Sequence, residues 1–301
     1  MGWVFYAIAA PALYAVSNFF DKFLIEKRVR DPIILAIIGG FLSCVVGFVI
    51  LMFRGFPGIP TNQLIYLLVA GVLFELALIP WYKALSLEDA SRVGPLFQVI
   101  PVLVLAMSYL FLGERLVLGQ LLGFLFILIG GYLLSVKKFG SGVFEIRRAL
   151  WWSLLSSLLF AIPFILFKFV SLEQGFWDSL AYEFIGGGIG ALILLISVVV
   201  FRDVGFRGGI IKRGFGTWAI IGSNEVIYIT SRVFNFYAIA LASASLVSVL
   251  GGFQPFFMLV FGLILSRWFP KIIKENVAKK VVVLKFVAVI LIFIGVWFVS
   301  A

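Results

Sequence analysis

Histidine is absent from this sequence, cysteine occurs once, and charged residues are few. The absence of histidine excludes His-ligated metal sites, Ser-His-Asp triads and imidazole proton relays. The single cysteine, Cys44, permits neither a disulfide within the chain nor a thiolate metal cluster, so we expect no metal and no cofactor. Charged residues make up 13% of the 301 residues, against about 25% in a typical soluble domain. Because so few polar side chains cannot cover a water-facing globule, the chain is expected to lie in a lipid bilayer.

Apolar side chains dominate the chain: 63% of the residues are hydrophobic. A transmembrane helix requires about 20 mostly apolar residues. Ten runs meet this requirement, at approximately 3–25, 33–53, 63–85, 92–112, 117–136, 149–170, 178–200, 216–239, 244–265 and 281–299. The runs are continuous rather than alternating, which argues against a strand barrel. The predicted fold class is an all-α polytopic membrane protein with ten transmembrane helices.

The two halves of the chain resemble one another. Residues 13–16 (Leu-Tyr-Ala-Val) align with residues 159–162 (Leu-Phe-Ala-Ile), and residues 82–85 align with residues 237–240. The alignments agree in order and spacing, which indicates a duplication. Because each copy holds five helices, an odd number, the second copy enters the membrane from the opposite side. We predict two inverted five-helix repeats, 1–140 and 141–301, around a central cavity.

A family resemblance follows from two segments. Residues 108–116, Ser-Tyr-Leu-Phe-Leu-Gly-Glu-Arg-Leu, follow Pro101 and are similar to the Leu-Gly-Glu-Arg motif of the drug/metabolite transporter superfamily, EamA-like family. Residues 236–245, with Gln254-Pro255 after them, resemble that family's second repeat. The second copy departs from the pattern, because it reads Leu-Ser-Arg-Trp at 265–268 in place of a Gly-Glu-Arg-like motif. The resemblance implies a basket of ten helices that moves metabolites, amino acids or amphiphiles by alternating access.

The positive charges are distributed unevenly between the connections. Arg232 lies inside a run; of the other 23 Lys and Arg residues, 20 lie in or beside the connections that follow odd-numbered runs. The other side holds Arg54, Arg115 and Lys168. The positive-inside rule therefore predicts a cell (inner or plasma) membrane protein with cytoplasmic odd-numbered connections and both termini outside, whereas the family resemblance implies the reverse. No Lys/Arg block resembles a nucleic-acid-binding tail, so no nucleic-acid partner is expected.

The eighth run carries a polar stripe. Glu225, Tyr228, Arg232 and Asn235 are spaced 3, 4 and 3 residues apart, which places them on one helical face. An ionisable group inside a membrane span costs about 2.5–3.5 kcal/mol on insertion scales, so such residues are functional candidates. This face is expected to line a cavity or to pack on another polar stripe. The alternative is a structural Glu–Arg network that fixes the register of the helices.

Three further runs add polar side chains. The third contains Glu75 near its middle, followed by Trp81 and Tyr82. Glu183, early in the seventh run, is either an interfacial anchor or a cavity group. The first run offers a cluster of polar residues: Tyr14, Ser17, Asn18, Asp21 and Lys22. Asp21 and Lys22 lie near the helix end, where extension of their side chains to water explains their presence as well as ligand binding does.

The fourth and ninth runs contain helix breakers with small polar residues. Proline removes a backbone hydrogen bond, and the freed carbonyl needs a partner or a wet cavity. Paired broken helices in equivalent repeat positions indicate a substrate pathway, although ordinary kinking in a packed bundle is the alternative. The residues are Pro95, Gln98 and Pro101 in the fourth run, and Ser245, Ser248, Gly251, Gly252, Gln254 and Pro255 in the ninth.

The fifth and tenth runs are apolar nearly all round and are expected to face lipid or a partner subunit, so a homodimer is one candidate arrangement. Gly119 with Gly123, and Gly186 with Gly190, fit small-xxx-small helix contacts. Such pairs indicate helix packing more than dimerisation.

No enzyme motif and no P-loop occur, so neither catalysis nor ATP-driven pumping is expected. We predict a secondary transporter of a small organic metabolite, with protons as a candidate coupling ion. The alternative is a flippase for a lipid-linked or amphiphilic head group. A lateral opening lined by polar residues would favour the flippase, and an enclosed midplane cavity would favour the solute transporter.

Specific roles follow from the charges. Arg232 is predicted to bind a substrate carboxylate or phosphate, and Glu75 and Glu225 to receive an ammonium group or coupling protons. A site with both charge signs suits a zwitterion such as an amino acid. If Arg232 only neutralises a glutamate, the preference for a zwitterion disappears. The predicted substrate-binding set is Tyr14, Asn18, Glu75, Trp81, Tyr82, Gln98, Glu225, Tyr228, Arg232, Asn235 and Gln254.

Overall fold

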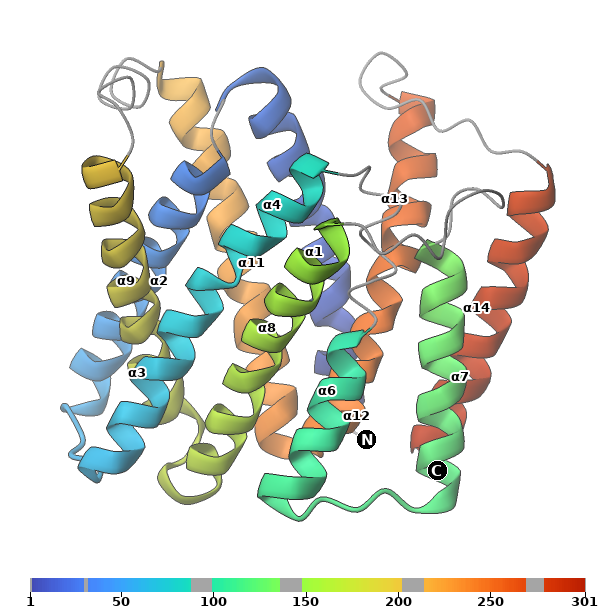
Figure 1. The fold of residues 1–301 in the computed structure, drawn as a ribbon, viewed down its shortest axis with the longest axis horizontal. Coiled ribbons are helices and arrows are strands. Elements are labelled where there is room, and N and C mark those ends of the chain that lie inside the picture. The colour runs from blue at the N-terminus through green and yellow to red at the C-terminus, as the bar shows by residue number, and fades with distance from the viewer. Residues whose placement is uncertain are drawn as a thin grey trace.

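The computed structural model describes residues 2–29, 32–87, 99–135, 148–201, 214–268 and 279–300. Within these ranges the regular structure is helical, with no strand, which confirms the predicted all-α class. The helices stand side by side with their long axes roughly aligned (Figure 1). Their bounds are α1 Gly2–Lys27, α2 Pro32–Arg54, α3 Thr61–Leu76, α4 Leu78–Leu87, α6 Val99–Met107, η1 Ser108–Leu112, α7 Leu118–Ser135, α8 Arg148–Gln174, α9 Phe176–Phe201, α11 Phe215–Leu241, α12 Ala244–Leu250, η2 Gly251–Phe253, α13 Gln254–Trp268 and α14 Lys279–Ser300.

Several of these helices are suited to a membrane. Each run expected from the sequence contains helix in the described part of the chain, and positions 92–98 of the fourth run lie outside it. Large apolar side chains point outward, including Phe53 and Trp297, which are 88% and 66% exposed. Soluble proteins rarely expose apolar surface on this scale, so the chain is a multi-pass membrane protein. By length and composition, six segments of the described ranges qualify as membrane spans: Gly2–Asp21, Ile33–Arg54, Thr61–Trp81, Leu150–Gln174, Phe176–Val199 and Ala244–Gly262.

Two of the expected helices are interrupted. The third run divides at Ala77 into α3 and α4. Pro80 lies three residues beyond the break, and because proline has no N–H it cannot donate to the carbonyl of Leu76. The ninth run divides into α12 and α13 through the short 3₁₀ turn η2, at the Gly251-Gly252 pair. The glycine pair predicted the second break, whereas the first was not expected from the length of the run.

Glycine allows α9 to pack closely against both α2 and α3. At the α2 contact, a Cβ at Gly47 would lie 2.6 Å from the carbonyl oxygen of Ala181. At the α3 contact, a Cβ at Gly71 would overlap the α9 backbone, and one at Gly190 would lie 3.2 Å from the α3 backbone. The small-residue pair Gly186 and Gly190 therefore packs α9 on α3 within this chain.

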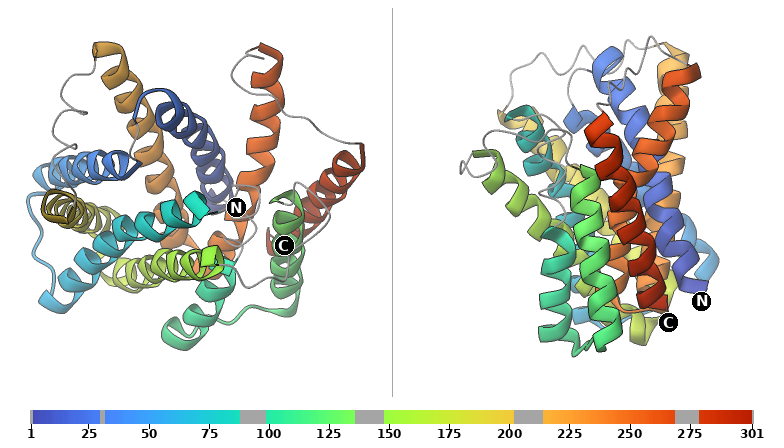
Figure 2. Two further views of the ribbon diagram at one scale, coloured as in Figure 1. Left: turned by 45° about the horizontal axis from the view of Figure 1, so that its top comes forward. Right: turned by 90° about the vertical axis from the view of Figure 1, so that its right-hand side faces the viewer.

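α7 and α14 pack against each other at one edge of the bundle (Figures 1 and 2). A Cβ at Gly123 would lie 2.6 Å from the carbonyl oxygen of Gly295, whereas one at Gly119 would meet nothing within 4 Å. Of the predicted pair, only Gly123 contributes to this contact. The two apolar helices thus face each other, and the homodimer stays a prediction.

Candidate functional site

Arg232 on α11 is a buried guanidinium that joins four helices. Its Nη2 donates to Glu183 Oε1 of α9 at 2.7 Å. Its Nη1 donates to Ser43 Oγ of α2 at 3.2 Å and lies 3.4 Å from Glu75 Oε1 of α3. We call Arg232, Glu75 and Glu183 the Arg232 cluster. One guanidinium therefore serves two carboxylates drawn from different helices.

The surroundings of the Arg232 cluster exclude water. The side chains of Arg232 and Glu183 are 0% exposed. The rings of Phe74 and Phe184 have their centroids 4.2 and 4.8 Å from the guanidinium carbon, within the range of cation–π attraction. Ion pairs strengthen in such a low-dielectric interior, and removal of one partner leaves a costly buried charge. The cluster therefore holds α11 against α3 and α9.

These contacts bear on the alternatives left open by the sequence. Arg232 lies between carboxylates, so the geometry favours a structural neutralising role over capture of a substrate anion. Glu183 is fully buried in this cluster, which removes the interfacial-anchor interpretation. The role of Arg232 as a substrate ligand stays a prediction.

A second polar group joins α11 to α1. Ser17 Oγ donates to Asn224 Oδ1 at 2.8 Å, and Asn224 Nδ2 donates to Asp21 Oδ1 at 2.7 Å. The adjacent Glu225 is 5% exposed, and its Oε2 has no hydrogen-bond partner among the described residues. Its carboxylate lies against α2, where a Cβ at Gly39 would come within 2.8 Å of Oε2. The missing side chain of Gly39 makes room for the carboxylate of Glu225.

Two tyrosines connect this group to the Arg232 cluster. Tyr14 of α1 and Tyr228 of α11 meet edge to face, with ring centroids 5.7 Å apart. Tyr228 lies one turn after Glu225 and one turn before Arg232 on the same helix. The stripe expected from spacing alone is therefore one continuous polar surface that faces α1, α2, α3 and α9.

The remaining predicted ligands are Asn18, Trp81, Tyr82, Gln98, Asn235 and Gln254. Asn18 Nδ2 lies 3.8 Å from the sulfur of Met258 on α13. The side chain of Tyr82 and the whole of Gln98 lie outside the described residues. The other members are half-buried, and their part in substrate binding stays a prediction: Trp81, Asn235 and Gln254.

Side chains tie the helices together at the end of the bundle where the N-terminus lies (Figure 1). We call this the even end, because it holds the connections 55–60, 113–117 and 242–243. Arg54 at the end of α2 makes two hydrogen bonds, of 2.8 and 3.1 Å, to Asp178 at the start of α9. Gln63 of α3 donates to Glu173 of α8, and Tyr182 donates to a carbonyl of the 55–60 connection at 2.8 Å. The even end is cross-linked by polar contacts.

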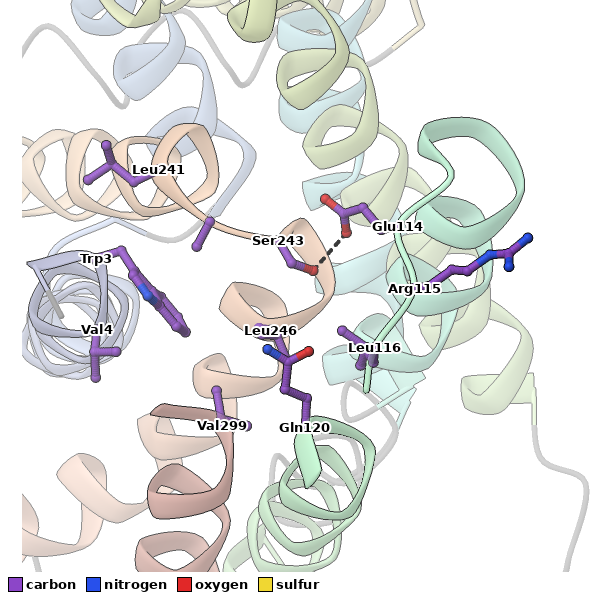
Figure 3. A pocket seen from close by; sticks show the side chains of 11 residues that line it. Trp3, Val4, Glu114, Arg115, Leu116, Gln120, Leu241, Ser243, Leu246 and Val299 are labelled. Carbon is purple, nitrogen blue, oxygen red and sulfur yellow. Dashed lines mark hydrogen bonds between the residues drawn. The ribbon is translucent and has the colours of Figure 1, made fainter. Parts of the chain in front are cut away.

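Glu114 closes the first turn of α12 at this end. Its Oε2 accepts from Ser243 Oγ at 2.7 Å (Figure 3) and from Ser245 Oγ at 3.3 Å. Its Oε1 accepts from the N–H of Ala244 at 3.1 Å. The first N–H groups of a helix have no partner within it, so this carboxylate supplies one. The Leu-Gly-Glu-Arg motif of the first half thus binds the start of a helix in the second half.

Two of the cavities in the described part of the chain lie beside the helices. One, of about 540 Å³, opens beside Glu114 and is also lined by Trp3, Arg115 and Gln120 (Figure 3). In the part of the chain that the structure describes, no group of His, Cys, Asp and Glu is placed to hold a metal ion. The other cavity, of about 260 Å³, lies between α1 and α13 and has an apolar lining of Val16, Phe19, Phe20, Phe261 and Ile264.

Comparison with known proteins identifies the family. A sequence profile of the EamA-like transporter family matches residues 1–136. An uncharacterized protein of Methanocaldococcus jannaschii is 31% identical over 131 residues, which cover 44% of this chain and 94% of that protein. The chain belongs to the EamA-like transporter family. Membership of this family, within the drug/metabolite transporter superfamily, indicates a membrane transporter rather than an enzyme.

Two further proteins resemble this EamA-like transporter. An uncharacterized transporter encoded in the cobO 3′ region of a Sinorhizobium species is 29% identical over 141 residues, covering 44% of this chain and 96% of that one. A solved crystal structure superposes with a TM-score of 0.69 at 16% identity, covering 98% of this chain and 93% of that chain. At this identity the superposition supports the fold alone.

Sequence reasoning missed several residues of this EamA-like transporter. Ser43, Phe74 and Phe184 contact Arg232, yet serine and phenylalanine inside apolar runs carry no signal. Glu114 was recognised only as part of a motif. The serines around position 243 at the start of a helix are the available signal that the helix needs a cap.

Proposed function

We propose that this protein is a secondary transporter that moves a small organic solute across the membrane by alternating access. Ten membrane-crossing helices in two inverted repeats, 1–140 and 141–301, would surround the site. The observation that carries the proposal is the buried polar surface formed by the Arg232 cluster, Tyr14, Tyr228 and Glu225. It draws side chains from both halves of the chain, and buried ionisable groups within membrane helices mark solute or ion pathways.

Helix packing supports the inverted repeats. In a two-fold arrangement, equivalent helices that touch each other lie on the axis. α2 packs on α9, and α7 packs on α14, which are the second and fifth helices of each proposed repeat. Likewise, α1 packs on α11 and α8 packs on α3, so the first helix of each repeat contacts the third helix of the other. The two relatives align over nearly their whole length but over less than half of this chain. This is what we expect if the chain contains two copies of one unit.

The charge distribution supports an orientation. With 20 of 23 cations beside odd-numbered connections, the even end faces outside and both termini lie there. The cross-links at the even end then describe a carrier closed toward the outside. Alternating access requires that these contacts break during the cycle.

Within the site, the Arg232 cluster and Glu225 have different roles. The Arg232 cluster holds the helices together, and Glu225 is the carboxyl group available to a ligand or to a coupling proton. The flippase alternative gains no support from the cavity between α1 and α13, which is lined by apolar residues and lacks the polar lining that a head group needs.

Transport in proteoliposomes tests the function. A labelled panel of amino acids, amines and nucleosides is offered to the wild type under an imposed pH gradient and without one. We expect uptake of one class, its loss in Glu225→Gln, and its retention in Val226→Leu, a matched change on the exposed face of the same helix. A wild type that moves no member of the panel, and instead scrambles lipids, would contradict the proposal.

A further inference from the structure

Among the side chains that the structure describes, the site holds more acids than bases. Arg232 interacts with Glu75 and Glu183, and no other acid of the described residues lies at hydrogen-bond distance from it. Asp21 receives a hydrogen bond from the amide of Asn224, a neutral donor. Glu225 directly follows Asn224, the partner of Asp21, and its Oε2 has no hydrogen-bond partner among the described residues. The described part of the site therefore contains four carboxyl groups and one guanidinium, which is bonded to two of them.

Such an imbalance has a physical consequence. An uncompensated carboxylate in a low-dielectric interior is expensive, so it binds a cation or a proton. Because the single guanidinium is engaged with two of the acids, compensation for Asp21 and Glu225 comes from outside the Arg232 cluster. The site is thus complementary to positive charge.

We propose that the transported solute is an organic cation whose ammonium group binds between Glu225 and Asp21 and competes there with protons. This inference rests on the proposed function, whose solute it specifies. The two acids approach from different helices, α11 and α1, as a ligand bridging a carrier's moving parts requires. Hydrogen bonds from an ammonium group to carboxylates are stronger than those between neutral groups.

The aromatic neighbours fit the same ligand. Tyr228 lies one turn from Glu225 and meets Tyr14 edge to face. A cation over a tyrosine ring gains about 0.5–1 kcal/mol when exposed and about 2 when desolvated, and flat apolar groups also pack well on such rings. An amine with an aromatic or aliphatic body would place its charge on the carboxylates and its body on the tyrosines.

A zwitterion fits less well. Its carboxylate would need a free cation, and the guanidinium of Arg232 is 0% exposed, bonded to Ser43 and both acids of its cluster. Its Nε has no partner among the described residues, but this atom is as buried as the rest of the group. A substrate carboxylate would have to displace Glu75 or Glu183 to reach it. The preference for a zwitterion, raised by the sequence, therefore gives way to a preference for a cation.

A matched ligand series tests the charge preference. Phenethylamine, phenylalanine and 3-phenylpropionate share one ring and differ in charge. Binding to the purified full chain is measured by thermal stability, and uptake by counterflow in proteoliposomes. We expect phenethylamine to bind and to be transported, with roughly 10- to 100-fold weaker binding in Glu225→Gln, because a charged hydrogen bond is lost. Val226→Leu should bind as the wild type does.

A second variant keeps the test interpretable if Glu225→Gln fails to fold. Gly39→Ala places a methyl group where the Glu225 carboxylate now lies, so it should weaken phenethylamine binding while every acid remains. Binding of phenylalanine or 3-phenylpropionate in preference to phenethylamine would overturn the cation assignment and leave the transporter standing. Phenethylamine binding that is equal in Glu225→Gln, Gly39→Ala and the wild type would also overturn it. Lack of uptake of any solute, with lipid scrambling in its place, would overturn the proposed function itself.

Discussion

Arg232→Met should be one of the most destabilising single changes in this chain. Removal of one partner from a buried ion pair costs about 3–5 kcal/mol. Here the loss leaves two carboxylates, at 2.7 and 3.4 Å from the guanidinium nitrogens, and also removes the attraction of two phenylalanine rings. We therefore expect a loss near the upper end, about 5 kcal/mol. Glu183→Gln keeps an acceptor for Nη2 and leaves Glu75 in place, so its cost should be about 1–3 kcal/mol.

The double variant separates pairing from packing. If the ion pair carries the effect, Arg232→Met with Glu183→Gln is less destabilised than the two single losses combined, with a coupling energy of about 1–3 kcal/mol. The free energy of unfolding is measured in mixed detergent micelles by the fluorescence of the eight tryptophans. Arg54→Met is the matched control, because its pair with Asp178 is half exposed on the arginine side and should matter much less. A loss in Arg232→Met no larger than in this control, or a coupling energy of zero, would refute the reasoning.

Three further changes address packing, capping and orientation. Gly71→Ala should separate α3 from α9 and lower the free energy of unfolding by about 1–3 kcal/mol. Gly119→Ala is the control and should leave the free energy of unfolding unchanged, because a Cβ there meets nothing within 4 Å. Equal effects of the two changes would show that the glycine contact is unimportant. Glu114→Ala removes three hydrogen bonds at the start of α12 and should cost about 0.5–2 kcal/mol, and faster labelling of the cysteine in an Ala242→Cys background would report the opening. A reporter active only in the cytoplasm, fused at Ala301, should stay silent, and activity there would disprove the charge-derived orientation.

The helices could be predicted because each apolar run has the length that a bilayer requires. The α11 stripe could also be predicted, since helical spacing places Glu225, Tyr228 and Arg232 on one face. Which residue pairs with Arg232 could not be read in the same way. The choice of Glu183 depends on the depth at which α9 crosses α11, and glycine contacts between helices set that depth. Periodicity describes one helix at a time, whereas the site is built between helices.

Glu114 has a consequence for the populations of the carrier's states. At the aligned position of the second half stands Arg267, whose side chain cannot accept hydrogen bonds from serine hydroxyls or N–H groups at a helix start. Residue 267 therefore cannot duplicate the carboxylate contact that Glu114 makes at the even end. Each 1.4 kcal/mol or so of difference between two conformations changes their ratio about tenfold. Under the proposed cycle, this one-sided cap biases the resting ensemble toward the state with its even end shut, so solute meets the binding groups first from the opposite face.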